Sequence, residues 1–173
     1  MDLESLRTAS LDFVEAHKAW TPAIAAILAF CESLAFLSLL VPATVILIGI
    51  GAMIGAADIP FWPVMLAASL GAALGDWISY EFGRAYGSDA KRLWPLRSHP
   101  GMVERGELFL RRWGAAAVAL GRFFGPARAV VPLIAGMFGV ARLPFQAANL
   151  LSALVWAFVL LAPGAGLIEW FRG

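Results

Sequence analysis

Charged residues are scarce in this chain. Of its 173 residues, only 14% are Asp, Glu, Lys or Arg, whereas 61% are hydrophobic, and the mean hydropathy is +0.78. A soluble domain carries about 25% charged residues, so this sequence lacks the polar side chains that would cover a surface in water. We therefore predict an all-α integral membrane protein, with hydrocarbon as the solvent for much of its surface.

Several chemical signals are also absent. The lone Cys31 excludes an internal disulfide, and a net charge of +1 gives no sign of a nucleic-acid partner. No Gly-rich phosphate loop, nucleophile elbow or HExxH motif occurs. His17 and His99 have no second ligand at metal spacing and are predicted to lie on the surface. We expect no enzyme, no metal and no cofactor.

The first 20 residues predict an amphipathic helix. Leu3, Leu6, Phe13 and His17 follow one helical face, with charged residues elsewhere. This start is acidic and polar, unlike the basic n-region of a cleaved signal peptide.

Two long apolar segments contain residues that break helices. Residues 23–57 are interrupted by Glu32 and Pro42. They are too many for one membrane span and too few for two, since a span needs about 20 residues. Residues 113–141 repeat the problem, with breakers at Gly125, Pro126, Pro132 and Gly136. Each segment predicts a re-entrant helical hairpin.

Each predicted hairpin precedes one predicted full span, at residues 61–82 and 144–168. The loop between the two halves, 83–112, holds seven basic residues against three acidic ones, so it is predicted to be cytoplasmic. Within this loop a second interfacial helix is predicted from Met102, Phe109, Leu110 and Trp113.

The order amphipathic helix, hairpin, span thus occurs twice within a chain made of an N-terminal helix (1–20) and a membrane domain (21–168). A hairpin returns to the side from which it entered, whereas a span crosses. The second unit would then have the opposite orientation, which predicts an inverted repeat as in many transporters. Gly71 and Gly75 form a small-xxx-small pair that would let another helix approach closely.

Four ionisable residues lie inside the apolar segments: Glu32, Asp76, Arg122 and Arg128. A charge in the bilayer costs about 2.5–3.5 kcal/mol or more, so such residues pair or line a wet cavity. A structural salt bridge and a binding site both remain open readings. A guanidinium offers a planar fork of donors that suits phosphate or carboxylate. The arginine pair therefore predicts an anionic headgroup, an acidic solute or a partner carboxylate.

Glu32 is the natural partner of the arginines, and a carboxyl between a low dielectric and a guanidinium could exchange a proton. Asp76 lies near the predicted cytoplasmic end of its span, where snorkelling or capping is an equal alternative. Asn149 is predicted to support hairpin backbone that is left bare at a break, and Trp156 is predicted to pack in the core.

These residues resemble a known family. The resemblance covers roughly residues 25–166 and rests on Glu32 followed by the Pro42 turn and on three motifs: LGDWISYEFGRAYG (74–87), GRFFGPARAVVPLIAGM (121–137) and NLLSALVW (149–156). Together they are similar to the DedA family of bacterial membrane proteins, which shares its domain with eukaryotic lipid scramblases.

The resemblance implies a multi-pass protein of the bacterial inner membrane with two opposed re-entrant hairpins. It also implies movement of lipids between leaflets, with roles in polyprenyl-phosphate recycling, phospholipid translocation and proton-dependent membrane homeostasis. The essential glutamate of the family maps onto Glu32, and its two essential arginines map onto Arg122 and Arg128. Many relatives carry a second acid after the first hairpin proline, where this chain has Thr44. Coupling through two hairpin carboxylates is therefore not expected.

We expect a translocase for an anionic lipid, such as a polyprenyl phosphate or a phospholipid. Membrane lipids, their anionic headgroups and protons are the expected partners, and a homo-oligomer stays open. Two alternatives use the same residues: a proton- or cation-coupled carrier of a small anion, and a non-transporting assembly factor whose buried charges only fix the fold.

Overall fold

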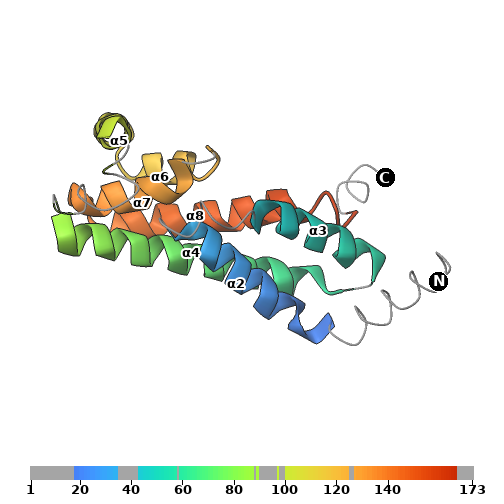
Figure 1. Ribbon diagram of the computed structural model, residues 1–173. Coiled ribbons are helices and arrows are strands. Elements are labelled where there is room, and N and C mark those ends of the chain that lie inside the picture. Colours follow the sequence, from blue (N-terminus) through green and yellow to red (C-terminus); the bar gives the residue numbers. More distant parts are fainter. Residues whose placement is uncertain are drawn as a thin grey trace.

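In a computed structural model, the described part of the chain comprises residues 18–34, 43–57, 59–87, 89, 97, 100–124 and 127–166. Every regular element in these residues is helical, which confirms the predicted all-α class. The elements are η1 (Lys18–Trp20), α2 (Thr21–Ser33), α3 (Ala43–Ala56), α4 (Phe61–Tyr86), α5 (Pro100–Trp113), α6 (Ala116–Gly121), α7 (Ala127–Met137) and α8 (Arg142–Leu161) (Figure 1).

Helices α4 and α8 are long and apolar enough to cross a membrane, with 26 and 20 residues. They pack side by side in opposite directions and form the frame of the molecule (Figure 1). At the end where α8 begins, the Tyr80 hydroxyl of α4 donates a hydrogen bond to the carbonyl of Val140. At the same end the Tyr80 ring stacks on Phe145, with 4.1 Å between the ring centroids.

The predicted ends of the spans need correction. Helix α4 continues past residue 82 to Tyr86 and stops before Gly87, whose φ of 50° suits glycine. Helix α8 begins two residues early, at Arg142, and ends at Leu161 rather than at 168. Pro163 lacks the N–H that a continuing helix would require, and turns follow as far as Gly166.

Two pairs of shorter helices approach the middle of this frame from opposite ends (Figure 1). Helix α2 ends near the middle of α4, where a Cβ at Gly75 would meet Ser33. Helix α3 runs back from there, so that Gly55 lies against Gly164 beyond the end of α8. From the other end, α6 leads toward the middle, and α7 returns alongside Gly83 of α4.

These four helices have 13, 14, 6 and 11 residues, fewer than the roughly 20 that a full span needs. The sequence prediction of short paired helices agrees with this arrangement. The breaks assigned to Pro42, Gly125 and Pro126 lie outside the described residues, as do the first 17 residues of the predicted amphipathic helix. Re-entry into a membrane and the inverted repeat stay predictions.

The prediction that Pro132 and Gly136 break the second segment is wrong. Both lie inside α7, which runs without interruption from Ala127 to Met137. A proline removes one backbone donor, and the packing around α7 tolerates that loss, since Pro132 is fully buried. Gly136 instead permits close packing, because a Cβ there would overlap the Tyr80 carbonyl of α4.

The Gly71–Gly75 pair is confirmed as a close-approach surface. A Cβ at Gly71 would overlap the Ala26 carbonyl, and one at Gly75 would lie 2.6 Å from the carbonyl of Phe30. Helix α2 therefore packs backbone to backbone on α4, the kind of contact that small residues permit in membranes.

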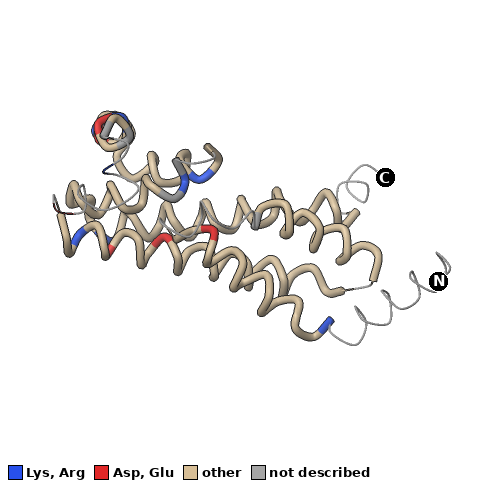
Figure 2. Tube along the Cα trace, viewed as in Figure 1, with Lys and Arg blue, Asp and Glu red and all other residues tan. Residues whose placement is uncertain are grey.

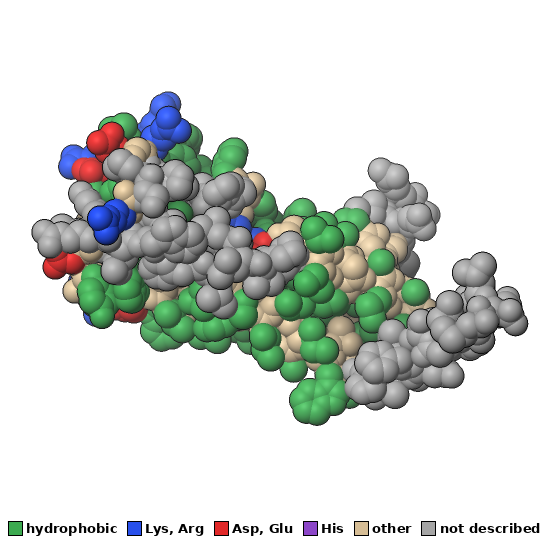
Figure 3. Space-filling view, in the orientation of Figure 1, with side chains coloured by type: hydrophobic (Ala, Val, Ile, Leu, Met, Phe, Trp, Pro, Cys, Tyr) green, Lys and Arg blue, Asp and Glu red, His purple; other side chains and the backbone are tan. Residues whose placement is uncertain are grey.

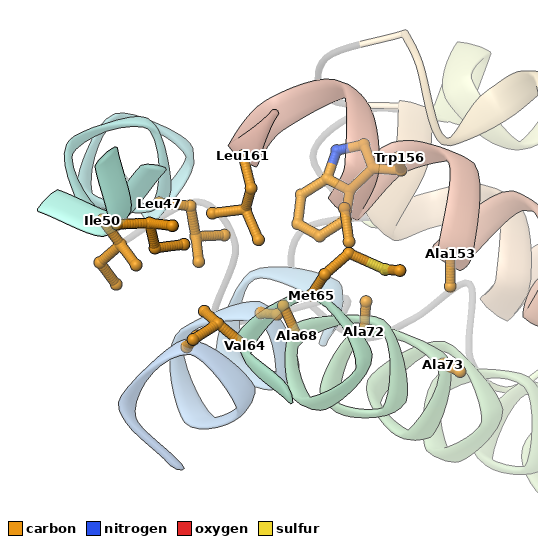
Figure 4. Packing of buried hydrophobic residues seen from close by; sticks show 14 of the residues in the cluster. Leu47, Ile50, Val64, Met65, Ala68, Ala72, Ala73, Ala153, Trp156 and Leu161 are labelled. Atoms are coloured by element: carbon orange, nitrogen blue, oxygen red, sulfur yellow. The ribbon is translucent and has the colours of Figure 1, made fainter. Parts of the chain in front are cut away.

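The buried hydrophobic residues form two clusters. The first joins α2, α3, α4 and α8 and includes Leu47, Met65, Trp156 and Leu161 (Figure 4). The second lies where α5, α6 and α7 cover the other end of α4 and α8. Charged positions along the bundle are few (Figure 2), and hydrophobic side chains cover much of the visible body, whereas charged ones gather mainly near α5 (Figure 3).

A helix is present where the sequence predicts one within loop 83–112, as α5, and its place at the membrane interface stays a prediction. It buries Val103 and Leu110 and exposes Arg111 and Arg112. Trp113, which sequence placed with the apolar residues, is 48% exposed and lies beneath the Arg112 guanidinium, with 5.7 Å between the Arg112 Cζ and the ring centroid.

Candidate functional site

The four ionisable residues of the apolar segments are all buried. Glu32, Asp76, Arg122 and Arg128 expose 6%, 3%, 2% and 8% of their surfaces. Such burial excludes snorkelling for Asp76. The structure brings the four side chains together as two ion pairs in the middle of the molecule, where the two pairs of short helices meet.

Arg128 and Glu32 form the first ion pair, between the start of α7 and the end of α2. Arg128 Nη1 donates to Glu32 Oε1 over 2.8 Å, and Nη2 donates to the Ser33 hydroxyl over 3.3 Å. The Thr44 hydroxyl, in the first turn of α3, donates to the same Glu32 oxygen. The guanidinium also lies over the Trp156 ring of α8, with Cζ 4.4 Å from its centroid.

Arg122 and Asp76 form the second ion pair, between the end of α6 and the middle of α4. Arg122 Nε donates to Ser152 Oγ over 3.0 Å, and Nη2 donates to Asn149 Oδ1 over 2.6 Å. Asn149 in turn donates from Nδ2 to the Ala73 carbonyl over 2.9 Å. This pair is therefore held by side chains of both long helices.

Two buried atoms in the cluster have no hydrogen-bond partner among the described residues: Glu32 Oε2 and Arg122 Nη1. Burying a donor or an acceptor without a partner costs about 1–3 kcal/mol. One atom is an acceptor on the first pair and the other is a donor on the second.

The structure places the predicted polar residues Glu32, Asp76, Arg122, Arg128, Thr44 and Asn149 in this cluster. Pro132 and Gly136 lie on α7, within the packing of that helix. The partner predicted for Asn149 needs correction, because it bonds a carbonyl within α4 and the Arg122 side chain rather than the bare backbone of a hairpin. Asn149 is fully buried, so its side-chain amide bonds to the residues that are packed around it.

Sequence reasoning missed Ser33 and Ser152, and it gave Trp156 only a packing role. Both serines carried a signal: Ser33 follows Glu32 directly, and Ser152 lies one helical turn after Asn149 on the same face of α8. Trp156 does pack in the first cluster, but it also supplies the aromatic face beneath Arg128.

The sequence comparisons agree with the motifs that form this cluster. Residues 41–166 match the model of the VTT domain. The chain is 34% identical to the inner membrane protein YabI of Escherichia coli strain K12 over 138 residues, which are 80% of this chain and 54% of YabI. It is 32% identical to the inner membrane protein YghB of the same strain over 127 residues, 73% of this chain and 58% of YghB.

An uncharacterized membrane protein of Buchnera aphidicola subsp. Schizaphis graminum is 32% identical over 162 residues, 94% of this chain and 62% of that protein. The chain thus spans less than two thirds of the length of these relatives. No solved structure gives a significant match. The helical architecture, the conspicuous apolar surface and these matches lead to one conclusion: the chain belongs to the VTT-domain, or DedA, family of membrane proteins.

Proposed function

We propose that this protein translocates an anionic lipid between membrane leaflets and performs no covalent chemistry. Its membrane would be the bacterial inner membrane, crossed by α4 and α8, with residues 83–112 on the cytoplasmic side. A polyprenyl phosphate and an anionic phospholipid share the relevant chemistry, a phosphate group attached to long hydrocarbon. The observation that carries the proposal is the buried Arg128–Glu32 pair at the meeting point of the two short-helix pairs.

The proposed mechanism is an exchange of partners on Arg128. This guanidinium is satisfied by one carboxylate oxygen, one serine hydroxyl and one aromatic face. A lipid phosphate can replace Glu32 because it offers the same anionic oxygens to the same fork of donors. The exchange leaves no guanidinium unpaired in a low-dielectric environment, which would otherwise be strongly unfavourable.

Release of Glu32 requires that its negative charge be compensated. In this mechanism a proton taken up by the Glu32 carboxyl supplies the compensation, while Thr44 still donates to Oε1. Protonation neutralises the carboxylate and weakens its hold on Arg128. Proton-dependent release of the arginine therefore accompanies lipid binding in this mechanism.

Arg122 has a different role from Arg128 in the proposal. Asp76, Asn149 and Ser152 hold its Nε and Nη2 atoms, whereas Nη1 has no partner among the described residues. This guanidinium can therefore keep its protein partners and offer one further donor to a phosphate oxygen. Arg128 exchanges ligands, and Arg122 stays in place.

The decisive experiment is lipid translocation in proteoliposomes. Fluorescent anionic phospholipid and a polyprenyl phosphate are followed separately for the wild type, Arg128→Ala and the control Arg142→Ala, which removes an exposed arginine paired with Glu81. We expect Arg128→Ala to reduce translocation by about 100-fold or more, as for loss of a buried charge-assisted contact, and Arg142→Ala to change it little.

Normal translocation by folded Arg128→Ala protein would refute the mechanism. If the wild type moves neither lipid but carries a small anion, the alternative carrier function is supported instead. If function in cells persists after charge-neutral, volume-matched replacement of both ion pairs, the assembly-factor alternative is supported.

A pH gradient across the same vesicles tests the part played by the proton. Translocation by the wild type is expected to respond to the gradient through Glu32, and Thr44→Asp is expected to strengthen the response. The new carboxyl would lie beside Glu32, and two adjacent carboxyls share a proton. An identical response of the wild type and Thr44→Asp would show that the Thr44 position does not tune coupling.

A further inference from the structure

A groove of about 410 Å³ lies between α5 and the α6–α7 pair. Its walls are apolar: Phe109 comes from α5, Phe124 from the turn after α6, and Val130 and Ile134 from α7. Among the described residues of its lining, only Arg105 of α5 is charged. Its volume falls within the roughly 300–1,000 Å³ that ligand sites occupy.

This groove is separate from the buried ion pairs. Ile134 follows Arg128 by six residues, about 240° around a regular helix, so the two side chains leave α7 on different faces. Val131, next to Val130, packs against Gly121 of α6, where an added Cβ would lie 2.9 Å from Val131 Cγ2. Gly121 and Val131 line the groove at this contact, and none of the four charged residues of the two ion pairs belongs to the lining.

The chemistry of the groove fits a hydrocarbon chain with an anionic end. Arg105 is exposed and makes no ion pair with the described residues. The charged residues of α5 leave this helix with a net charge of +1: Glu107 is bonded to Arg111, and Glu104, Arg105 and Arg112 are exposed. Arg105 therefore places a guanidinium at an otherwise apolar groove.

The position of α5 brings lipid to this groove. Charged side chains gather mainly at the end of the molecule where α5 lies, while hydrophobic side chains cover much of the visible body (Figure 3). The exposed Trp113 on α5 and Phe124 beside the groove are side chains typical of the boundary between headgroups and hydrocarbon. An amphipathic helix at that depth meets phosphate on its polar side and acyl chains on its apolar side.

We propose that the α5–α7 groove binds one acyl chain of an anionic membrane lipid, whose headgroup contacts Arg105. Bound in this way, the lipid fills the space beneath α5 and fastens this helix to the α6–α7 pair. The site differs from the proposed translocation site in its residues and in its occupant's chemistry, which is dominated by the chain rather than by the phosphate.

Photolabelling of the full chain in phosphatidylcholine vesicles tests the site. The probe is a trace of phosphatidate with a diazirine on its acyl chain, and labelled peptides are mapped after illumination. We expect labelling of α5 and α7 residues in the groove. Labelling should fall about fivefold in Arg105→Gln, because one interfacial cation contributes about that factor to anionic-lipid binding, and should be unchanged in Arg112→Gln.

A second variant, Val130→Phe, is expected to reduce labelling by filling the groove. Because Arg105 is exposed, Arg105→Gln keeps the test decisive even if Val130→Phe does not fold. The proposal is overturned if Arg105→Gln labels like the wild type, if a phosphatidylcholine probe labels the groove equally, or if labelling spreads evenly over the outer faces of α4 and α8. Arg128→Ala should keep groove labelling, so failure of lipid translocation is a separate result.

Discussion

At the scale of single residues, the central feature is a division of labour between two arginines. Arg122 is bound by an acid, an amide and a hydroxyl that belong to the two long helices. Arg128, at the start of α7, is bound by Glu32 and Ser33 at the end of α2 and by the Trp156 ring. We therefore expect Arg128 to change partners more readily than Arg122, which the two long helices hold in place.

The buried Arg122–Asp76 ion pair, here called the frame pair, predicts how substitutions change the stability of the fold. Asp76→Ala leaves Arg122 buried without its acid, so it should lower the free energy of unfolding by about 3–5 kcal/mol. The double variant Asp76→Leu, Arg122→Met removes both charges and should recover most of that loss. Thermal unfolding of the purified proteins in detergent measures both effects.

The exposed pair of Glu81 and Arg142, with 2.9 Å between Glu81 Oε1 and Arg142 Nε, is the matched control. Glu81→Ala should change the unfolding temperature little, since solvent screens exposed pairs. An Asp76→Ala protein as stable as the wild type, or a double variant less stable than the single one, would contradict a structural role for the frame pair.

At the scale of helices, contact between backbones determines the packing on α4. Gly71 and Gly75 of α4 let α2 approach closely. Gly83 of α4 and Gly136 of α7 let these two helices approach each other in the same way. These contacts set where Ser33 and Glu32 lie along α4, and therefore where Arg128 can find its carboxylate. The position of the site along the frame follows from small residues that carry no chemistry themselves.

Gly71→Ala tests that dependence. The new Cβ would overlap the Ala26 carbonyl, so the variant should lose about 1–3 kcal/mol of stability through overpacking and should reduce translocation by displacing α2. Gly49→Ala is the control, because a Cβ there meets nothing within 4 Å, and it should stabilise α3 by about 0.5–1 kcal/mol. Chemical unfolding in detergent compares the two variants, and equal effects would exclude the packing explanation.

At the scale of the whole molecule, the helix ends fall into two groups. The end of α3 lies against the residues after α8, and the end of α4 lies beside the start of α8. If α4 and α8 cross the membrane, the chain segments within one group lie on the same side of the membrane, and the two groups lie on opposite sides. The predicted repeat of hairpin and span requires the same grouping.

Cysteine labelling in intact cells tests this arrangement. After Cys31→Ser, single cysteines at Asp89 and Gly139 should react with a membrane-impermeant maleimide only after permeabilisation. Asp89 lies in the loop that is predicted to be cytoplasmic, and a re-entrant hairpin over residues 113–141 would return Gly139 to the same side. Cysteines at Pro60 and Pro163 should react without permeabilisation. Labelling of Asp89→Cys and Gly139→Cys from opposite sides would exclude the re-entrant reading of residues 113–141.

Much of this protein was determined by sequence alone. Scarce charge and abundant hydrophobic residues required helices in an apolar solvent, because every backbone polar group must then be bonded within its own segment. The cost of burying charge also singled out Glu32, Asp76, Arg122 and Arg128, whatever their neighbours. The motifs around them were sufficient to indicate the family that the comparisons show.

Only the tertiary structure decided which charge meets which. Glu32 and Arg128 are separated by 96 residues and Asp76 and Arg122 by 46, and the chemistry of a carboxylate does not distinguish one arginine from another. The pairing depends on how close the glycines let the helix backbones approach. For the same reason Pro132 and Gly136, which local propensity predicts as breaks, lie inside α7: packing on α4 outweighs the loss of one backbone donor.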